Sequence, residues 1–170
     1  MIGQRAGKSN RAPKSLKARA VGLLARREYP RSELRQKLLA VRGGVDAPMP
    51  TPGEVDALLD ELVALGYLSD ARFAKSVVRQ KSGAFSQRHI AESLKAKGVT
   101  GEAAGEALAG NEVDDEVALV ALWRRRFGRA PANDREKSRQ VRFLQSRGFS
   151  LSAIFRLLRA PPVEDDASPG

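Results

Sequence analysis

The sequence of 170 residues contains no cysteine and a single histidine, His89. The absence of cysteine excludes disulfide frameworks, zinc fingers, thiol catalysis and cysteine-ligated clusters. One histidine excludes any site that needs two imidazoles. No run of 18 apolar residues occurs, which excludes a membrane-spanning helix. The basic N-terminal stretch has no apolar core of the kind found in signal peptides, so we expect a cytoplasmic protein.

Signals for catalysis are also scarce. No Gly-rich loop ending in Lys-Ser or Lys-Thr is present, so no nucleotide-binding loop is indicated. His89 lies in a basic segment and has no evident triad partner. The acidic run 114–116 stands at the start of a predicted helix, where carboxylates interact favourably with the helix dipole. We therefore predict a protein that is not an enzyme and holds no metal or cofactor.

Positive charge, by contrast, is abundant. The chain carries 30 Lys and Arg against 20 Asp and Glu, a formal net charge of +10 and a pI of about 10.5. Twelve Lys and Arg but only three Asp and Glu lie in residues 1–50, a net charge of +9. Clustered positive charge suggests a polyanionic partner, most often nucleic acid. Basic surface that only increases solubility is the alternative.

Three clusters of basic residues are the candidates for contact with a partner or with DNA. Like charges at such short spacing repel one another modestly, so DNA phosphates or acidic protein surface would explain their grouping. For any single residue, a solvated helix face is the alternative. The three clusters are Arg26, Arg27, Arg31, Arg35 and Lys37; Arg88, Lys95 and Lys97; and Arg124, Arg125, Arg126 and Arg129.

Apolar residues recur with helical spacing along nearly the whole chain. Alternating β-branched runs and Asn-Gly hairpin turns are absent, so we predict an all-α fold. Thr51-Pro52-Gly53-Glu54 forms a capping box with proline at the first helical position. Helices are predicted at residues 16–28, 32–42, 52–65, 70–82, 87–97, 101–109, 113–127, 133–147 and 151–159.

The nine predicted helices group by three. In each group a basic amphipathic helix is followed by a glycine, at Gly43, Gly98 or Gly148, and then by an apolar helix. A unit of three short helices buries too little surface alone, so stacked neighbours must supply the rest. We predict an elongated, curved, solenoid-like molecule of three tandem three-helix repeats. The predicted segments are a disordered basic arm at 1–14, repeats at 15–68, 69–110 and 111–160, and a disordered acidic tail at 161–170.

Two short motifs carry a resemblance to a known family. One is Gly-Tyr-Leu-Ser-Asp-Ala-Arg-Phe-Ala over residues 66–74, and the other is Arg-Gly-Phe over residues 147–149. Weaker motifs at 33–38 and 88–99 support them. Together they resemble the RecX family, regulators of the bacterial recombinase RecA, over most of the chain. The motif residues are Gly66, Tyr67, Asp70, Arg72, Phe73, Gly98, Arg147, Gly148 and Phe149.

The resemblance implies the same three tandem three-helix repeats and no catalytic activity. It implies a partner, RecA or the filament that RecA forms on single-stranded DNA. It also implies inhibition of the recombinase, ATPase and coprotease activities of RecA in DNA repair and the SOS response. We expect a monomer. The alternative is a general helical DNA-binding protein without a specific protein partner, and charge alone does not decide between the two.

In the first motif we expect Gly66 to end one helix and Asp70 to begin the next. Tyr67, Leu68 and Phe73 are expected to pack at the junction of the first two repeats.

Three further residues carry structural expectations. Phe149 is expected to pack in the third repeat, and Trp123 is expected in the core rather than as a base-stacking platform. One residue departs from the family pattern, because Pro30 stands where a capping serine is usual. Either that cap is lost or Ser32 replaces it.

Overall fold

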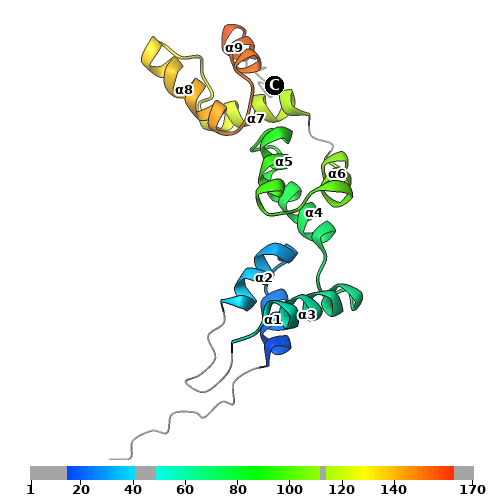
Figure 1. Cartoon of the computed structure of the whole chain (residues 1–170). Coiled ribbons are helices and arrows are strands. Elements are labelled where there is room, and N and C mark those ends of the chain that lie inside the picture. Colours follow the sequence, from blue (N-terminus) through cyan, green and yellow to red (C-terminus); the bar gives the residue numbers. More distant parts are fainter. Residues whose placement is uncertain (1–14, 41–48, 112–113, 163–170) are drawn as a thin grey trace, which may run out of the picture. The chain divides into compact units, whose positions relative to one another are not determined.

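The computed structural model describes residues 15–40, 49–111 and 114–162, and these residues form nine α-helices and no strand (Figure 1). The predicted all-α fold is therefore confirmed. The chain divides into two compact units between Ser69 and Asp70. The helices are α1 (Leu16–Leu24), α2 (Arg31–Leu39), α3 (Pro52–Ala64), α4 (Asp70–Lys81), α5 (Gln87–Ala96), α6 (Gly101–Ala109), α7 (Asp115–Arg126), α8 (Asp134–Ser146) and α9 (Leu151–Arg159).

Several predictions fall where the structure gives no test. The basic arm at 1–14, Gly43 and most of the acidic tail lie outside the described residues. The residue limits of the repeats and the elongated, curved shape stay predictions.

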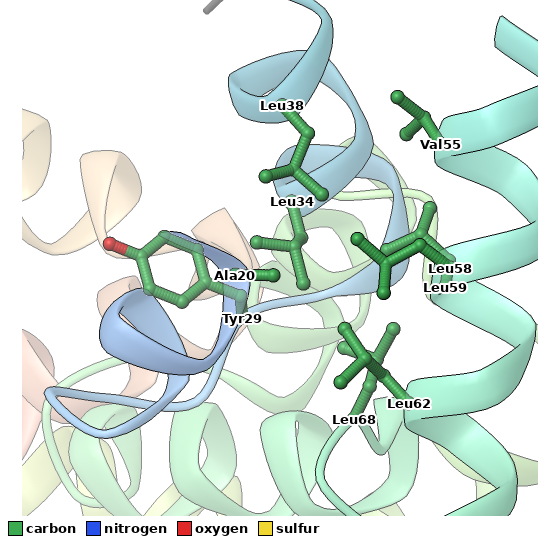
Figure 2. Close-up of a cluster of buried hydrophobic side chains, with 9 residues drawn as sticks. All are labelled: Ala20, Tyr29, Leu34, Leu38, Val55, Leu58, Leu59, Leu62 and Leu68. Carbon is green, nitrogen blue, oxygen red and sulfur yellow. The ribbon is translucent and has the colours of Figure 1, made fainter. Parts of the chain in front are cut away.

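The first unit holds one apolar core built by α1, α2 and α3. Leu34 and Leu38 of α2 face four apolar side chains of α3, and Ala20 of α1 and the Tyr29 ring complete the cluster (Figure 2). Leu68, from the first motif, also lies in this core and is 2% exposed. Fully burying a leucine side chain contributes roughly 1.5–3 kcal/mol, so these contacts hold the three helices together.

The second unit holds two separate cores. One joins α4, α5 and α6 and includes Phe73 and Val99. The other joins α7, α8 and α9 and includes Phe149 and Trp123. The Trp123 indole N–H donates to Gln140 Oε1 at 2.9 Å, which satisfies a polar group inside this core. The predicted core positions of Trp123 and Phe149 are confirmed.

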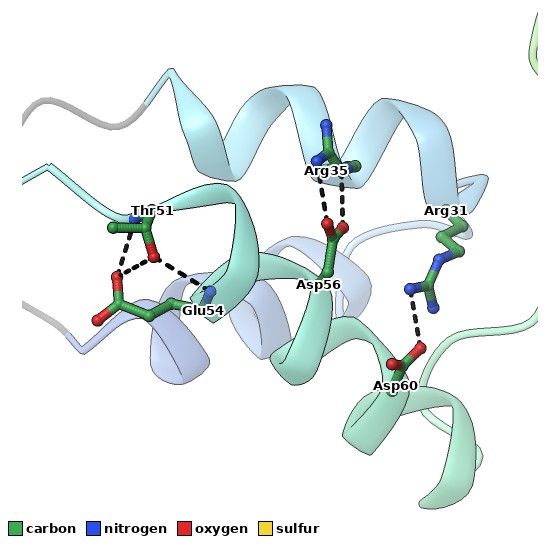
Figure 3. Close-up of polar contacts among 6 residues, drawn as sticks. All are labelled: Arg31, Arg35, Thr51, Glu54, Asp56 and Asp60. Carbon is green, nitrogen blue, oxygen red and sulfur yellow. Dashed lines mark hydrogen bonds and ion pairs between the residues drawn. The ribbon is translucent and has the colours of Figure 1, made fainter.

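Several predicted helix ends are confirmed. The Thr51 hydroxyl accepts from the Glu54 N–H at 3.3 Å, and the Glu54 carboxylate accepts from the Thr51 N–H at 2.8 Å (Figure 3). These reciprocal bonds make the capping box that begins α3. Asp70 begins α4. Gly66, Gly98 and Gly148 each follow a helix with positive φ, at 74°, 75° and 91°, as a glycine after a helix is expected to do.

The first predicted helix is too long by four residues, because α1 ends at Leu24. The chain turns over residues 25–27 and brings Tyr29 into the first core, directly ahead of Pro30. Proline disfavours helical backbone at the residue that precedes it, so a helix could not continue through Tyr29. Arg26 and Arg27, which the predicted helix at 16–28 includes, therefore lie beyond the end of α1.

The structure decides between the two alternatives at Pro30 and corrects one further prediction. Pro30 is the N-cap of α2 and forms no side-chain cap hydrogen bond, so the serine cap is lost. Tyr67 is 52% exposed and is not packed as expected, because only Leu68 of that pair turns into the first core. Phe73 packs in the core of α4, α5 and α6.

Candidate partner-binding surface

Two arginines of the first basic cluster form ion pairs between α2 and α3. Arg35 donates to both carboxylate oxygens of Asp56, at 2.6 and 3.0 Å, and Arg31 lies 2.8 Å from Asp60 (Figure 3). The hydrogen bonds from Arg35 lower the pKa of Asp56. Paired bidentate contacts of this kind fix geometry. Arg31 and Arg35 thus help to join the two helices.

Two of the remaining members of this cluster, Arg27 and Lys37, lie beside Tyr29. The Arg27 guanidinium lies 3.7 Å from the centre of the Tyr29 ring and pairs with Glu33 at 2.6 Å. The Lys37 ammonium lies 5.8 Å from the same ring centre. Arg26 is exposed and makes no side-chain ion pair within the described residues. Of the five, Arg26 is the member most open to a partner.

Acidic residues of α3 offset part of the charge surplus of the first fifty residues, and five of the Lys and Arg in that surplus lie outside the described residues. The described residues 15–40 and 49–69 contain seven Lys and Arg but also six Asp and Glu, a net charge of +1. Four of the acidic residues lie on α3, which packs against α2. A count along the sequence cannot show this, because the compensating acids come after residue 50.

The second basic cluster lies on the exposed side of α5 and just after it. Arg88 pairs with Glu92 one turn later at 3.0 Å, and both side chains are exposed. Lys95 and Lys97 are exposed as well. The described residues 70–111 carry a net charge of +3. Exposed pairs such as that of Arg88 contribute little to stability, so this guanidinium can exchange its partner at small cost.

The third cluster lies in the most basic part of the described chain. Residues 114–160 contain eleven Lys and Arg against five Asp and Glu, a net charge of +6. Arg124 and Arg125 are exposed at the end of α7 and form no ion pair within the described residues. Arg126 lies over the rings of Phe127 and Phe143. Arg129 pairs with Glu136 at 3.3 Å.

Sequence reasoning overlooked further cations on α8. They recur on this helix with spacings of two or three residues, and all of them are exposed. The signal was present in the sequence, but acids nearby masked the local excess. These residues are Arg135, Lys137, Arg139 and Arg142.

The Arg-Gly-Phe motif joins the two cores of the second unit. The Ser86 N–H donates to the Arg147 carbonyl at 3.0 Å, and the Gln87 N–H donates to Asp115 at 2.8 Å. A Cβ atom at Gly148 would clash with the Ser86 hydroxyl and lie only 2.6 Å from the His89 Cβ. Only glycine permits this close approach, so the motif holds the turn before α9 against the start of α5.

An aromatic group with three basic neighbours lies beside this joint. The Phe85 ring stacks on His89 at 4.6 Å, and Arg147 lies 4.7 Å and Lys81 4.6 Å from the Phe85 ring centre. Burial, then the charge of Lys81 and that of Arg147, lower the pKa of His89. The single histidine is thus a packing residue at the joint.

The acidic run at the start of α7 is accounted for by protein contacts. Asp114 caps α7, Asp115 accepts from Gln87, and Glu116 lies 2.5 Å from Arg156. Within the described ranges no group of three or more His, Asp or Glu side chains is placed to hold a metal ion. No helix there has the length and apolarity to cross a membrane.

Comparison with known proteins places the chain among regulatory proteins. A family model described as the second three-helix domain of RecX matches residues 69–108, and one described as the third matches residues 114–158. Regulatory protein RecX from Ralstonia nicotianae is 41% identical over 157 residues, which cover 92% of this chain and 94% of that protein. The protein of the same name from Chromobacterium violaceum is 42% identical over 153 residues, with coverages of 90% and 94%.

Solved structures show the same fold. The crystal structure of RecX from Lactobacillus salivarius aligns with a TM-score of 0.58 at 20% identity, covering 85% of this chain and 92% of that one. The nine helices of the described residues, the matched three-helix domains and the close relatives agree. The chain belongs to the RecX family of regulatory proteins.

Proposed function

We propose that this chain is a non-enzymatic regulator of a RecA recombinase. It binds RecA, or the filament that RecA forms on single-stranded DNA, and restrains its recombinase, ATPase and coprotease activities. The observation that carries the proposal is the family membership, with 41% identity to a regulatory protein over 92% of the chain. The proposal includes action in the cytoplasm as a monomer, in DNA repair and the SOS response.

The charge distribution supports a polyanionic partner. Exposed arginines without ion pairs in the described residues concentrate in the part of the chain that carries +6, with Arg124 and Arg125 as examples. A protein–DNA filament offers both phosphates and acidic protein surface as counter-charges. We keep all twelve basic residues of the three clusters as candidates, with Arg124 and Arg125 ranked above Arg31 and Arg35.

A binding experiment tests the proposal. RecA filaments are assembled on immobilised single-stranded DNA with a slowly hydrolysed ATP analogue, and binding of the full chain is compared with binding to the same DNA without RecA. We expect tighter binding to the filament. Equal binding to both surfaces would favour the alternative, a general helical DNA-binding protein. The net charge of +10 is compatible with either function.

A further inference from the structure

A basic groove runs between α8 and α9. Its volume is about 770 Å³. It is lined by Arg135, Lys137, Ser138, Val141 and Arg142 of α8 and by Phe155 of α9. Three cations and no carboxylate line it, which gives the groove a single sign of charge.

Two acidic residues near the groove, Glu136 and Glu116, are directed elsewhere. Glu136 accepts from the Ala132 N–H at 3.0 Å and from Arg129, at the beginning of α8. Glu116 pairs with Arg156. Arg135, Lys137 and Arg142 form no ion pair within the described residues. Their charges are therefore available to an anionic ligand.

The spacing of these cations suits a chain of phosphates. Arg135, Ser138 and Arg142 follow one another at three and four residues, so they share one face of α8. Arg135 and Arg142 are seven residues apart, about 10 Å along a helix. Successive nucleotides of one strand rise about 3.4 Å in a duplex, so the two arginines can reach different phosphates.

The groove also contains an exposed aromatic ring. Phe155 is 41% exposed, although aromatic side chains of this size are usually covered in a folded chain. The Lys137 ammonium lies 5.8 Å from its ring centre, and the half-buried Val141 lines the groove beside it. An aromatic face next to cations is the arrangement that stacks an unpaired base while its phosphates are held.

We propose that the groove between α8 and α9 binds single-stranded DNA directly, with a base stacked on Phe155 and phosphates held by Arg135 and Arg142. Single strands are favoured over duplex because bases in a duplex are already stacked on each other. The inference goes beyond the proposed function, since it concerns DNA bound in the absence of RecA. The binding of the chain to a RecA filament can fail while the groove still binds DNA, and DNA binding in the groove can fail while the chain still binds the filament.

The test measures binding of a labelled oligothymidylate to the full chain without RecA, by fluorescence anisotropy at several salt concentrations. Phe155→Ala is expected to weaken binding about tenfold, the loss of one stacked base, with an unchanged salt dependence. Arg142→Gln is expected to lower the slope of log affinity against log salt by about 0.7, the share of one phosphate contact.

Matched variants on α9 serve as controls. Leu151→Ala removes another exposed apolar side chain of this helix that does not line the groove, and is expected to leave the affinity unchanged. Arg156→Gln removes a charge that already pairs with Glu116, and is expected to leave the salt slope unchanged. Phe155→Trp keeps a stacking ring, so binding is retained and the emission of the added indole is quenched by the oligonucleotide. Trp123 is 2% exposed and provides the folding reference.

Three results would overturn the inference. The first is equal affinity for a duplex of the same length. The second is an equal effect of Phe155→Ala and Leu151→Ala. The third is Phe155-dependent binding of an oligoglutamate peptide together with Phe155-independent binding of the oligothymidylate, which would make an acidic protein segment the occupant.

Discussion

At the residue scale, Gly148 is the glycine at which an added Cβ atom would make the closest contacts. Its φ of 91° lies in the left-handed region, and the start of α5 occupies the space that a side chain would need. The left-handed backbone costs a residue with a Cβ roughly 1–2 kcal/mol. The clash adds about 1–3 kcal/mol, as overpacking in a core does.

We therefore predict that Gly148→Ala lowers the free energy of unfolding of the second unit by about 2–5 kcal/mol. Urea denaturation followed by Trp123 fluorescence measures it. Gly83→Ala is the matched control, because Gly83 lies in the same unit, between α4 and α5, and has a positive φ of 74° but no atom within 4 Å of the place where a Cβ would lie. This control variant should lose only the roughly 1–2 kcal/mol of stability that left-handed backbone costs a residue with a Cβ. Equal losses for the two variants would show that contact with Ser86 and His89 is unimportant.

At the element scale, part of this structure could be predicted from sequence. Local signals were sufficient for the capping box at Thr51 and for the glycines that follow helices, because their partners lie within a few residues. The pairing of Arg35 with Asp56 spans 21 residues, and nothing in the local pattern specifies it. The contact of Gly148 with His89 was missed for the same reason.

The ion pairs of α2 and α3 predict an acid-sensitive first unit. Hydrogen bonds from Arg35 lower the pKa of Asp56, and those from the backbone and hydroxyl of Thr51 lower the pKa of Glu54. A carboxyl whose pKa is lower in the folded state stabilises the fold at pH values above its unfolded pKa, near 4. That stability is lost as the pH falls through the folded pKa.

We predict that the urea midpoint of the first unit stays level between pH 7 and 5 and declines below about pH 4. The midpoint is measured by backbone hydrogen exchange of α3 amides at increasing urea concentration, because these amides report on the first unit alone. Asp56→Asn should lower stability at pH 7 and flatten the decline in acid. A decline of the same steepness in the variant would mean that other groups cause the acid sensitivity.

At the scale of the whole molecule, the net charge of each folded unit differs from the net charge of a stretch of fifty residues. Counting along the chain gives +9 in the first fifty residues, whereas the described folded chain carries +1 up to residue 69 and +6 in residues 114–160. Half of the difference arises because α3 adds four acids to the first unit. The other half arises because residues 1–14 and 41–48, which carry a net charge of +4, lie outside the described residues. Sequence reasoning proposed a polyanionic partner, and the fold changes which cations are open to it.

Two sets of variants separate pairing from partner contact. Changing Arg26, Arg27, Arg31 and Arg35 together to Ala is expected to weaken filament binding without unfolding the chain, but also to lower its urea midpoint, since three of them are paired. Arg124→Ala with Arg125→Ala should weaken filament binding at an unchanged midpoint. Full filament affinity in the Arg124 and Arg125 double variant would remove α7 from the contact surface.

The proposed function requires that this chain acts on a recombinase filament rather than on DNA alone. The rate of ATP hydrolysis by RecA on single-stranded DNA, measured while the full chain is added in increasing amounts, distinguishes the two. We predict that hydrolysis falls when the chain is present well below one copy per RecA protomer. Hydrolysis that is unaffected until the added chain is sufficient to coat the DNA would contradict the proposed function.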